Sequence, residues 1–267
     1  MISSQLQSRI PGWKQVAELR HAKGWPYIAT WAHRISGVFL TLYLVFHILT
    51  LSSLHTPEKF IEKMAFFSPI FPGFLELFLA FPVIYHSLNG GRLILYEIYG
   101  HRNDIIIFRY VVGLSLVYLF LLAVFMINGD QSVSAFFFWS YVAVGSCCLA
   151  FVTIVKLKNN RASIYWKLQR ISGAYLLIMI PAHMLFMHLD PTIGRDVDII
   201  TQRMNTVFMK FIDTGLLVSA LYHGGYGLTT ICSDYIFNHK TRFILSTAVF
   251  LGTVVLAFIG INVTFSI

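Results

Sequence analysis

The chain alternates between long apolar runs and short polar segments. Each run is close to the length of about 20 residues that an α-helix needs to cross the hydrocarbon core of a membrane. The pattern therefore predicts an all-α fold, a polytopic transmembrane helical bundle of about seven helices. The predicted helices cover residues 35–54, 74–96, 106–127, 135–155, 168–189, 211–236 and 243–265.

The basic residues support seven crossings. If the N-terminus is cytoplasmic, the cytoplasmic segments contain 15 of the 20 Lys and Arg residues, as the positive-inside rule expects. Residues 1–34 contain no apolar run followed by a small-residue cleavage site, so we expect no signal peptide. We predict an integral protein of a bacterial-type inner (cytoplasmic) membrane, surrounded by membrane lipid. The basic residues on the opposite side are Lys59, Lys63, Arg195, Arg203 and Lys210.

The chain also contains an internal repeat. The tetrapeptide Arg-Ile-Ser-Gly at residues 34–37 returns at residues 170–173. A histidine follows at the same interval in both copies, 13 residues after the arginine, as His47 and as His183. Two segments with this spacing predict two structurally equivalent parts.

A second histidine in each copy extends the repeat. His86 is followed after 11 residues by Glu97, and His223 is followed after 11 residues by Asp234. If each repeat has three helices and both repeats run parallel, an extra crossing must join them, and the run at 135–155 is suited to it. The predicted parts are a cytoplasmic N-terminal segment (1–34), a first three-helix repeat (35–127), a bridging transmembrane helix (128–160) and a second three-helix repeat (161–267).

The four repeated histidines fall at hydrocarbon depth. At about 1.5 Å per residue, His47 and His183 lie roughly 20 Å from their arginines, and His86 and His223 about 16 Å from their acidic residues. Ionisable groups at this depth are costly and usually functional. Two imidazoles on facing helices can take both axial positions of haem, whereas hydrogen bonding between helices is the structural alternative.

Other residues near these histidines are open to more than one interpretation. His188 follows His183 closely and is an alternative ligand in its place. Five further histidines fall at or outside the predicted helix ends, which indicates interfacial or solvated positions: His21, His33, His55, His101 and His239. Glycines adjoin the second histidines and make room either for a porphyrin or for close helix packing: Gly90, Gly91, Gly224, Gly225 and Gly227.

Composition excludes one further class of partner. The chain is 57% hydrophobic and 12% charged, with a formal net charge of +8. A positive charge can indicate nucleic-acid binding. Here the basic residues separate apolar runs and form no basic face with interleaved aromatic residues, so we predict no nucleic-acid partner.

At these residues the chain resembles the membrane anchors of succinate:quinone oxidoreductases and fumarate reductases. Residues 33–37 resemble the His-Arg-x-[Ser/Thr]-Gly opening of the large anchor, with Thr30 in the place of its quinone-site serine. His86 and the residues up to Glu97 resemble the large anchor's haem-ligand segment, His-x3-Gly-x-Arg-x4-Asp. His223 with Asp234-Tyr235 is similar to the small anchor's His-x10-Asp-Tyr.

The resemblance implies a fusion of the two anchors with specific site residues. His47 and His183 resemble further ligands of single-chain, two-haem anchors, which implies two b-type haems, held by His86 with His223 and by His47 with His183. The two-subunit pattern implies one haem. The implied quinone-binding residues, for menaquinone or ubiquinone, are Thr30, Arg34, Asp234 and Tyr235. Because Trp25-Pro26-Tyr27 replaces the large anchor's Arg-Pro-x-Ser-Pro-His segment, transfer of the quinone site is less direct, and two-haem relatives bind quinone near the outer face.

The sequence therefore predicts a haem b membrane anchor subunit of a succinate:quinone oxidoreductase or quinol:fumarate reductase. In this interpretation it passes electrons between an iron-sulfur subunit and membrane quinone, while a flavoprotein subunit reacts with the dicarboxylate. Two alternatives stay open at this point. One is the dihaem cytochrome b subunit of a hydrogenase or formate dehydrogenase, and the other is a cofactor-free transporter, a class in which internal repeats are common.

Overall fold

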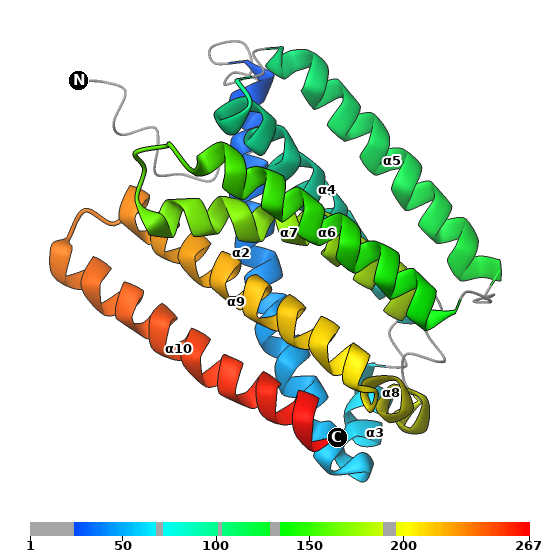
Figure 1. Ribbon diagram of the computed structural model, residues 1–267. Helices are drawn as coiled ribbons and strands as arrows, with labels where there is room; N and C mark the ends of the chain where they lie inside the picture. The colour runs from blue at the N-terminus through cyan, green and yellow to red at the C-terminus, as the bar shows by residue number, and fades with distance from the viewer. Residues whose placement is uncertain (1–23, 68–71, 101–102, 129–133, 189–195) are drawn as a thin grey trace.

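The computed structural model describes residues 24–67, 72–100, 103–128, 134–188 and 196–267. Within these ranges every regular element is a helix. Figure 1 shows long, tilted helices with two short helices, α3 and α8, together at one end. The elements are α2 (Trp25–Leu51), η2 (Ser52–His55), α3 (Pro57–Phe67), α4 (Pro72–Ile98), α5 (Asp104–Asn128), α6 (Ala135–Leu157), α7 (Ile164–Met187), α8 (Val197–Met204), α9 (Val207–Tyr235) and α10 (His239–Ser266).

All seven predicted apolar runs form long helices. Five spans are long and apolar enough to cross a membrane on their own, namely α2 with η2, α5, α6, α7 and α10. The α8–α9 pair meets the same criterion with a 92° bend between its helices. The helix α4 has 27 residues, but polar residues such as His86, Asn89 and Arg92 lower its hydropathy. The helix α4 packs against α2, α5 and α7 but does not meet the criterion of length and hydropathy, so the seventh crossing stays a prediction.

The surface of the bundle suits a lipid environment. Large apolar side chains are exposed along α5 and α10, among them Phe120, Phe250 and Phe258. Such side chains would be unfavourable in water over so large an area, whereas they are compatible with lipid. The protein is an all-α, polytopic integral membrane protein.

The first long helix begins earlier than its apolar run. The backbone of Gly24 has a φ of 78°, which glycine adopts without strain, and Pro26 occupies the first turn of α2. The helix therefore begins at Trp25 and includes Arg34. The predicted boundary between residues 34 and 35 falls inside α2.

The two repeats run in the same direction. The start of α2 meets the end of α9 through Arg34 and Asp234, and the start of α7 meets the end of α4 through Arg170 and Glu97. Each repeat uses the same packing order, with α4 between α2 and α5, and α9 between α7 and α10. The end of the bundle that carries these ion pairs is called the arginine end below, and the other is called the α8 end.

The helix α6 joins the repeats and supports the α8 end of the bundle. It packs along α7, and its Trp139 is fully buried. The surrounding core contains apolar residues from α7 and α9, including Met179, Phe186 and Ile212. Although α6 carries no histidine, it fixes the helices that do.

Candidate functional site

A large cavity is lined by residues from both ends of the bundle. Its volume is about 650 Å³, within the range of roughly 300–1,000 Å³ that is usual for ligand sites. Residues from α2, α4, α7 and α9 line most of it. The imidazoles in its lining are those of His33, His47, His86, His183, His188 and His223.

His86 and His223 form one facing pair across the repeats. Their ring centres are 6.2 Å apart and their planes lie at 90°. An imidazole nitrogen lies about 2 Å from a bound transition metal, and the ring centre about 1 Å farther, so two imidazoles on one metal have centres about 6 Å apart. The spacing of this pair fits two axial ligands of one iron.

The repeated tetrapeptide holds His86 in place. The Nδ1 atom of His86 lies 3.1 Å from the Ser36 hydroxyl and 3.1 Å from the His33 carbonyl oxygen. A Cβ atom on Gly37 would lie 2.9 Å from Cε1 of His86, so a larger residue would displace the ring. With Nδ1 engaged, Nε2 is the nitrogen left for a metal, which is the usual arrangement of a ligand histidine.

The second copy of the tetrapeptide does the same for His223. The Ser172 hydroxyl lies 3.4 Å from Nδ1 of His223, and a Cβ atom on Gly173 would lie 3.1 Å from its Cε1. Gln169 adds a hydrogen bond from Nε2 to the His223 carbonyl oxygen at 3.2 Å. The repeat therefore has a structural meaning. In each copy the serine contacts Nδ1 of a histidine on the next long helix, and the glycine leaves room for the ring of that histidine.

His47 and His183 form the second facing pair, at the α8 end. Their ring centres are also 6.2 Å apart, with planes at 88°. Tyr43 stacks against His47, and Trp139 of α6 contacts His183. Nδ1 of His183 is buried and has no hydrogen-bond partner among the described residues. The ring centre of His188 lies 6.1 Å from that of His47 and 5.7 Å from that of His183, and the choice of ligand between His183 and His188 stays a prediction.

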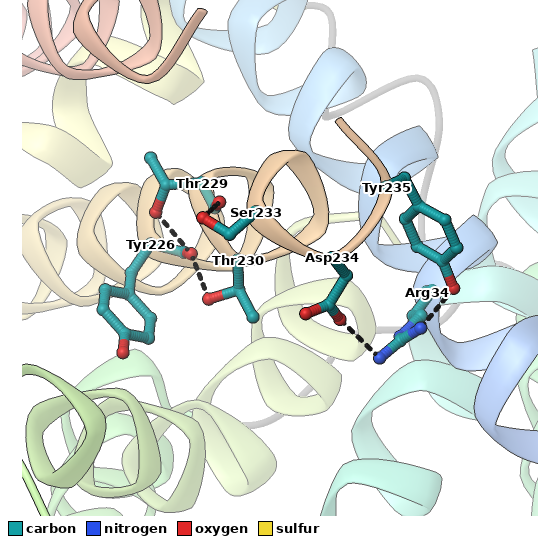
Figure 2. Close-up of polar contacts among 7 residues, drawn as sticks. All are labelled: Arg34, Tyr226, Thr229, Thr230, Ser233, Asp234 and Tyr235. Atoms are coloured by element: carbon teal, nitrogen blue, oxygen red, sulfur yellow. Dashed lines mark hydrogen bonds and ion pairs between the residues drawn. The ribbon is translucent and has the colours of Figure 1, made fainter. Parts of the chain in front are cut away.

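Arg34 contacts two of the other predicted quinone-site residues at the arginine end, Asp234 and Tyr235. Its guanidinium donates to Asp234 at 2.7 Å and to the Tyr235 hydroxyl (Figure 2). The side chains of Arg34 and Asp234 are 35% and 40% exposed, so water reaches this pair. Trp31 packs against the Tyr235 ring.

Thr30 is the fourth predicted quinone-site residue and lies one turn before Arg34. Its hydroxyl donates to the Pro26 carbonyl oxygen at 2.9 Å, and both Thr30 and Arg34 line the cavity. Asp234 and Tyr235 contact Arg34 but are not part of the cavity lining. The site is therefore at the mouth of the cavity, shared between α2 and α9.

The last turns of α9 direct only two polar side chains towards Arg34. The hydroxyls of Thr229, Thr230 and Ser233 donate to carbonyl oxygens of α9 itself (Figure 2). These residues satisfy their hydrogen bonds within the helix. Asp234 and Tyr235 are therefore the polar groups of this segment that reach across to α2.

An equivalent ion pair occupies the related position of the other repeat. Arg170 lies 2.6 Å from Glu97, and its guanidinium packs over the Trp166 ring at 4.7 Å. Ile98 follows Glu97, where Tyr235 follows Asp234. The two ion pairs are therefore alike in charge, but they differ in the residue after the carboxylate, which is a tyrosine on the Arg34 side and an isoleucine on the Arg170 side.

His33 was predicted to be interfacial or solvated, and this prediction was wrong. Because α2 starts at Trp25, His33 lies inside the helix, and its ring stacks on His86 with centres 3.9 Å apart. His55 is exposed and His239 begins α10, as expected for interfacial positions. His21 and His101 are outside the described residues.

The glycines near the second histidines line the cavity, allow close helix packing, or do both. Gly90, Gly224 and Gly227 line the cavity. Added Cβ atoms would lie 3.2 Å from Leu177 at Gly91 and 2.7 Å from Thr253 at Gly225, so these two glycines allow close helix packing. Gly224 also packs closely, since an added Cβ atom there would lie 3.0 Å from Thr41. Close helix packing is therefore confirmed for these three glycines, and room for a porphyrin stays a prediction.

Comparison with known proteins identifies the family. The succinate dehydrogenase/fumarate reductase transmembrane subunit family matches residues 22–127 and matches again over residues 152–261. Neither the search of curated proteins nor that of solved structures found a significant match. The chain belongs to this family of membrane subunits of oxidoreductase complexes, and its two matched regions correspond to two anchor repeats in one chain.

Proposed function

We propose that the chain is a dihaem cytochrome b anchor that passes electrons between an iron-sulfur subunit and membrane quinone. The observation that carries this proposal is that two pairs of histidines in one cavity have the same geometry. The ring centres are 6.2 Å apart in both pairs, and the ring planes lie at 90° in one and at 88° in the other. Membership of the succinate dehydrogenase/fumarate reductase transmembrane subunit family supports a role as the membrane subunit of such a complex. It favours this function over a hydrogenase or formate dehydrogenase subunit and over a transporter.

In this proposal His86 and His223 hold one haem b, and His47 and His183 hold a second. Bound haem supplies one-electron transfer, with a potential set by its ligands and surroundings. Ser36 and the equivalent Ser172 keep the ligand rings oriented by contact with Nδ1.

The quinone head group binds at the arginine end. The Tyr235 oxygen accepts a hydrogen bond from Arg34, so its own O–H remains available to donate to a quinone carbonyl oxygen. Asp234 fixes the guanidinium from the other side and, being exposed to water, can exchange a proton with the aqueous phase. A site for quinone needs such donors and a proton route.

The same proposal gives the membrane orientation and the partners. The arginine end faces the cytoplasm of a bacterial-type cell, because the positive-inside rule places most basic residues there. Separate iron-sulfur and flavoprotein subunits dock on this basic face, since the sequence carries no iron-sulfur cysteine pattern and no dinucleotide-binding motif.

Purification of the whole complex tests the proposal. A tag on this chain should recover the iron-sulfur and flavoprotein subunits. Added succinate should chemically reduce the haem, which changes its absorbance spectrum, and the electrons should pass on to added quinone as the final acceptor. Copurification without a haem spectrum would leave the family assignment intact and contradict the electron-transfer role of this chain.

A further inference from the structure

A small groove lies where α10 packs against α2 and α9. Its volume is about 140 Å³, and Figure 1 shows α10 running beside α9. The polar side chains in its lining are those of Thr41 and Thr253, and their hydroxyls donate to the Gly37 and Val249 carbonyl oxygens of their own helices. The groove therefore offers packing to an apolar chain and no free hydroxyl proton to a polar ligand.

The groove lies at hydrocarbon depth. Thr41 follows Arg34 by 7 residues, which is about 10 Å along α2, and Gly224 precedes Asp234 by 10 residues, which is about 15 Å along α9. Both α2 and α10 are long and apolar enough to cross a membrane. A cavity of about 150 Å³ with apolar walls can bind benzene, so the groove has room for a similar length of hydrocarbon.

The groove continues the seam between α2 and α9 at which the proposed quinone head group binds. On α2, Trp31 packs against the Tyr235 ring and Val45 lines the groove. These two residues are 14 positions apart, so they share one face of the helix. On α9, Leu228 lines the groove and precedes Tyr235 by 7 residues, again on one face. An apolar chain that extends along the seam from a head group at Tyr235 therefore meets the groove.

A wall of α2 and α9 side chains separates the groove from the large cavity. The residues that line both are Thr41, Leu44, Ala220, Gly224 and Leu228. The two helices are in close contact within this wall, since a Cβ atom on Gly224 would lie 3.0 Å from the Thr41 hydroxyl oxygen. Asp234 and Tyr235 are also outside the cavity lining. A chain in the groove therefore runs beside the cavity and leaves the cavity to the haem of the proposed function.

We propose that the groove between α2, α9 and α10 binds the isoprenoid tail of the membrane quinone whose head group lies at Arg34, Asp234 and Tyr235. This proposal rests on the proposed quinone function of the chain. The tail is the occupant because the groove is apolar, lies at hydrocarbon depth and follows the seam that begins at the head group. Lipid is as apolar as the groove, so the tail gains packing and a preformed path rather than removal from water. The expected effect of blocking the groove is therefore severalfold in KM.

Gly252 of α10 allows the groove to be filled without disturbing the helices. It lines the groove, and an added Cβ atom there meets nothing within 4 Å. Gly113→Phe on α5 is the matched control for Gly252→Phe, because a Cβ atom at Gly113 also meets nothing within 4 Å and this residue lines neither the groove nor the cavity.

The test measures two KM values in the purified complex, one for a quinone with several isoprene units and one for a quinone with the same head group and no tail. We expect Gly252→Phe to raise the ratio of the first KM to the second severalfold, and Gly113→Phe to leave the ratio unchanged. Gly252→Leu, with a smaller side chain, should raise the ratio to a smaller extent.

An unchanged ratio in both Gly252 variants would overturn the proposal. Loss of bound phospholipid from these variants at an unchanged ratio would show that the groove holds an acyl chain instead. An equal rise in Gly113→Phe would also overturn it, because the effect would not come from the groove. Each of these results leaves the proposed function standing, whereas an unsubstituted complex that turns over neither quinone contradicts that function and the tail site with it.

Discussion

His86 and His223 face each other from different halves of the chain, with ring centres 6.2 Å apart and planes at 90°. Each ring is held at Nδ1 by the serine of its own repeat. The first prediction follows from this arrangement. His86→Ala or His223→Ala should remove one haem and leave the other, because His47 and His183 form a separate pair. Haem quantification per chain checks it, and loss of both haems with the chain still folded would show that the two pairs are not independent sites.

The glycine of the repeated tetrapeptide should be needed for ligand placement. A Cβ atom on Gly37 would lie 2.9 Å from the His86 ring, and such overpacking costs about 1–3 kcal/mol. Gly37→Ala should therefore lower haem occupancy at the arginine end and the thermal stability of the holoprotein. Gly113→Ala is the control, because a Cβ atom there meets nothing within 4 Å. Equal behaviour of the two variants would contradict this role.

The quinone site should depend on Tyr235 and Arg34. Tyr235→Phe removes the O–H that would donate to quinone, and Arg34→Ala removes the group that holds both Tyr235 and Asp234. Each should lower quinone-linked turnover severalfold or more. Succinate oxidation with an artificial acceptor that takes electrons before quinone should stay near normal. If both activities fall together, these residues are structural, as interfacial anchors or haem-propionate partners would be.

A carboxylate at the other end provides a control for the position of the quinone. Asp213 of α9 lines the cavity, as do Arg203 and Met204 of α8. With the quinone at the arginine end, Asp213→Asn should leave quinone-linked turnover unchanged. A severalfold decrease in this variant, with Arg34→Ala unaffected, would move the site to the α8 end, where two-haem relatives place it.

If α6 crosses the membrane between the two repeats, the loops before and after it should lie on opposite sides of the membrane. The apolar length of α6 qualifies it as a membrane span, so positions 130 and 160 should lie on opposite sides, although residue 130 is outside the described residues. Single cysteines at these positions, in a chain whose native cysteines Cys147, Cys148 and Cys232 are replaced, should react with impermeant reagents from opposite sides. If both positions react from the same side, α6 does not cross the membrane, and the parallel arrangement of the repeats is contradicted.

The long helices were predictable because hydropathy alone defines apolar spans. The start of α2 was not, because it depends on the positive φ of Gly24 and on Pro26 in the first turn rather than on apolar residues. For this reason His33 was misplaced. The short helix α8 and its 92° bend into α9 were also missed, since eight polar and apolar residues give too weak a periodic signal.

The candidate site was predictable as a set of residues but not as a geometry. Equal intervals in the two repeats selected both histidine pairs, and the structure brings each pair together. Spacing along the chain carries no information on ring orientation, so the stacking of His33 on His86 and the closeness of His188 to His47 needed the three-dimensional arrangement. The contacts of Ser36 and Gly37 with His86 could have been sought from their repetition alone.

The most direct test of the central claim is a reduced-minus-oxidised spectrum of the purified complex with haem quantified per chain. Four histidines in two pairs of the same geometry predict a b-type spectrum and two haems per chain. One haem would contradict the assignment of His47 and His183, and the absence of any haem spectrum would contradict the electron-transfer account as a whole.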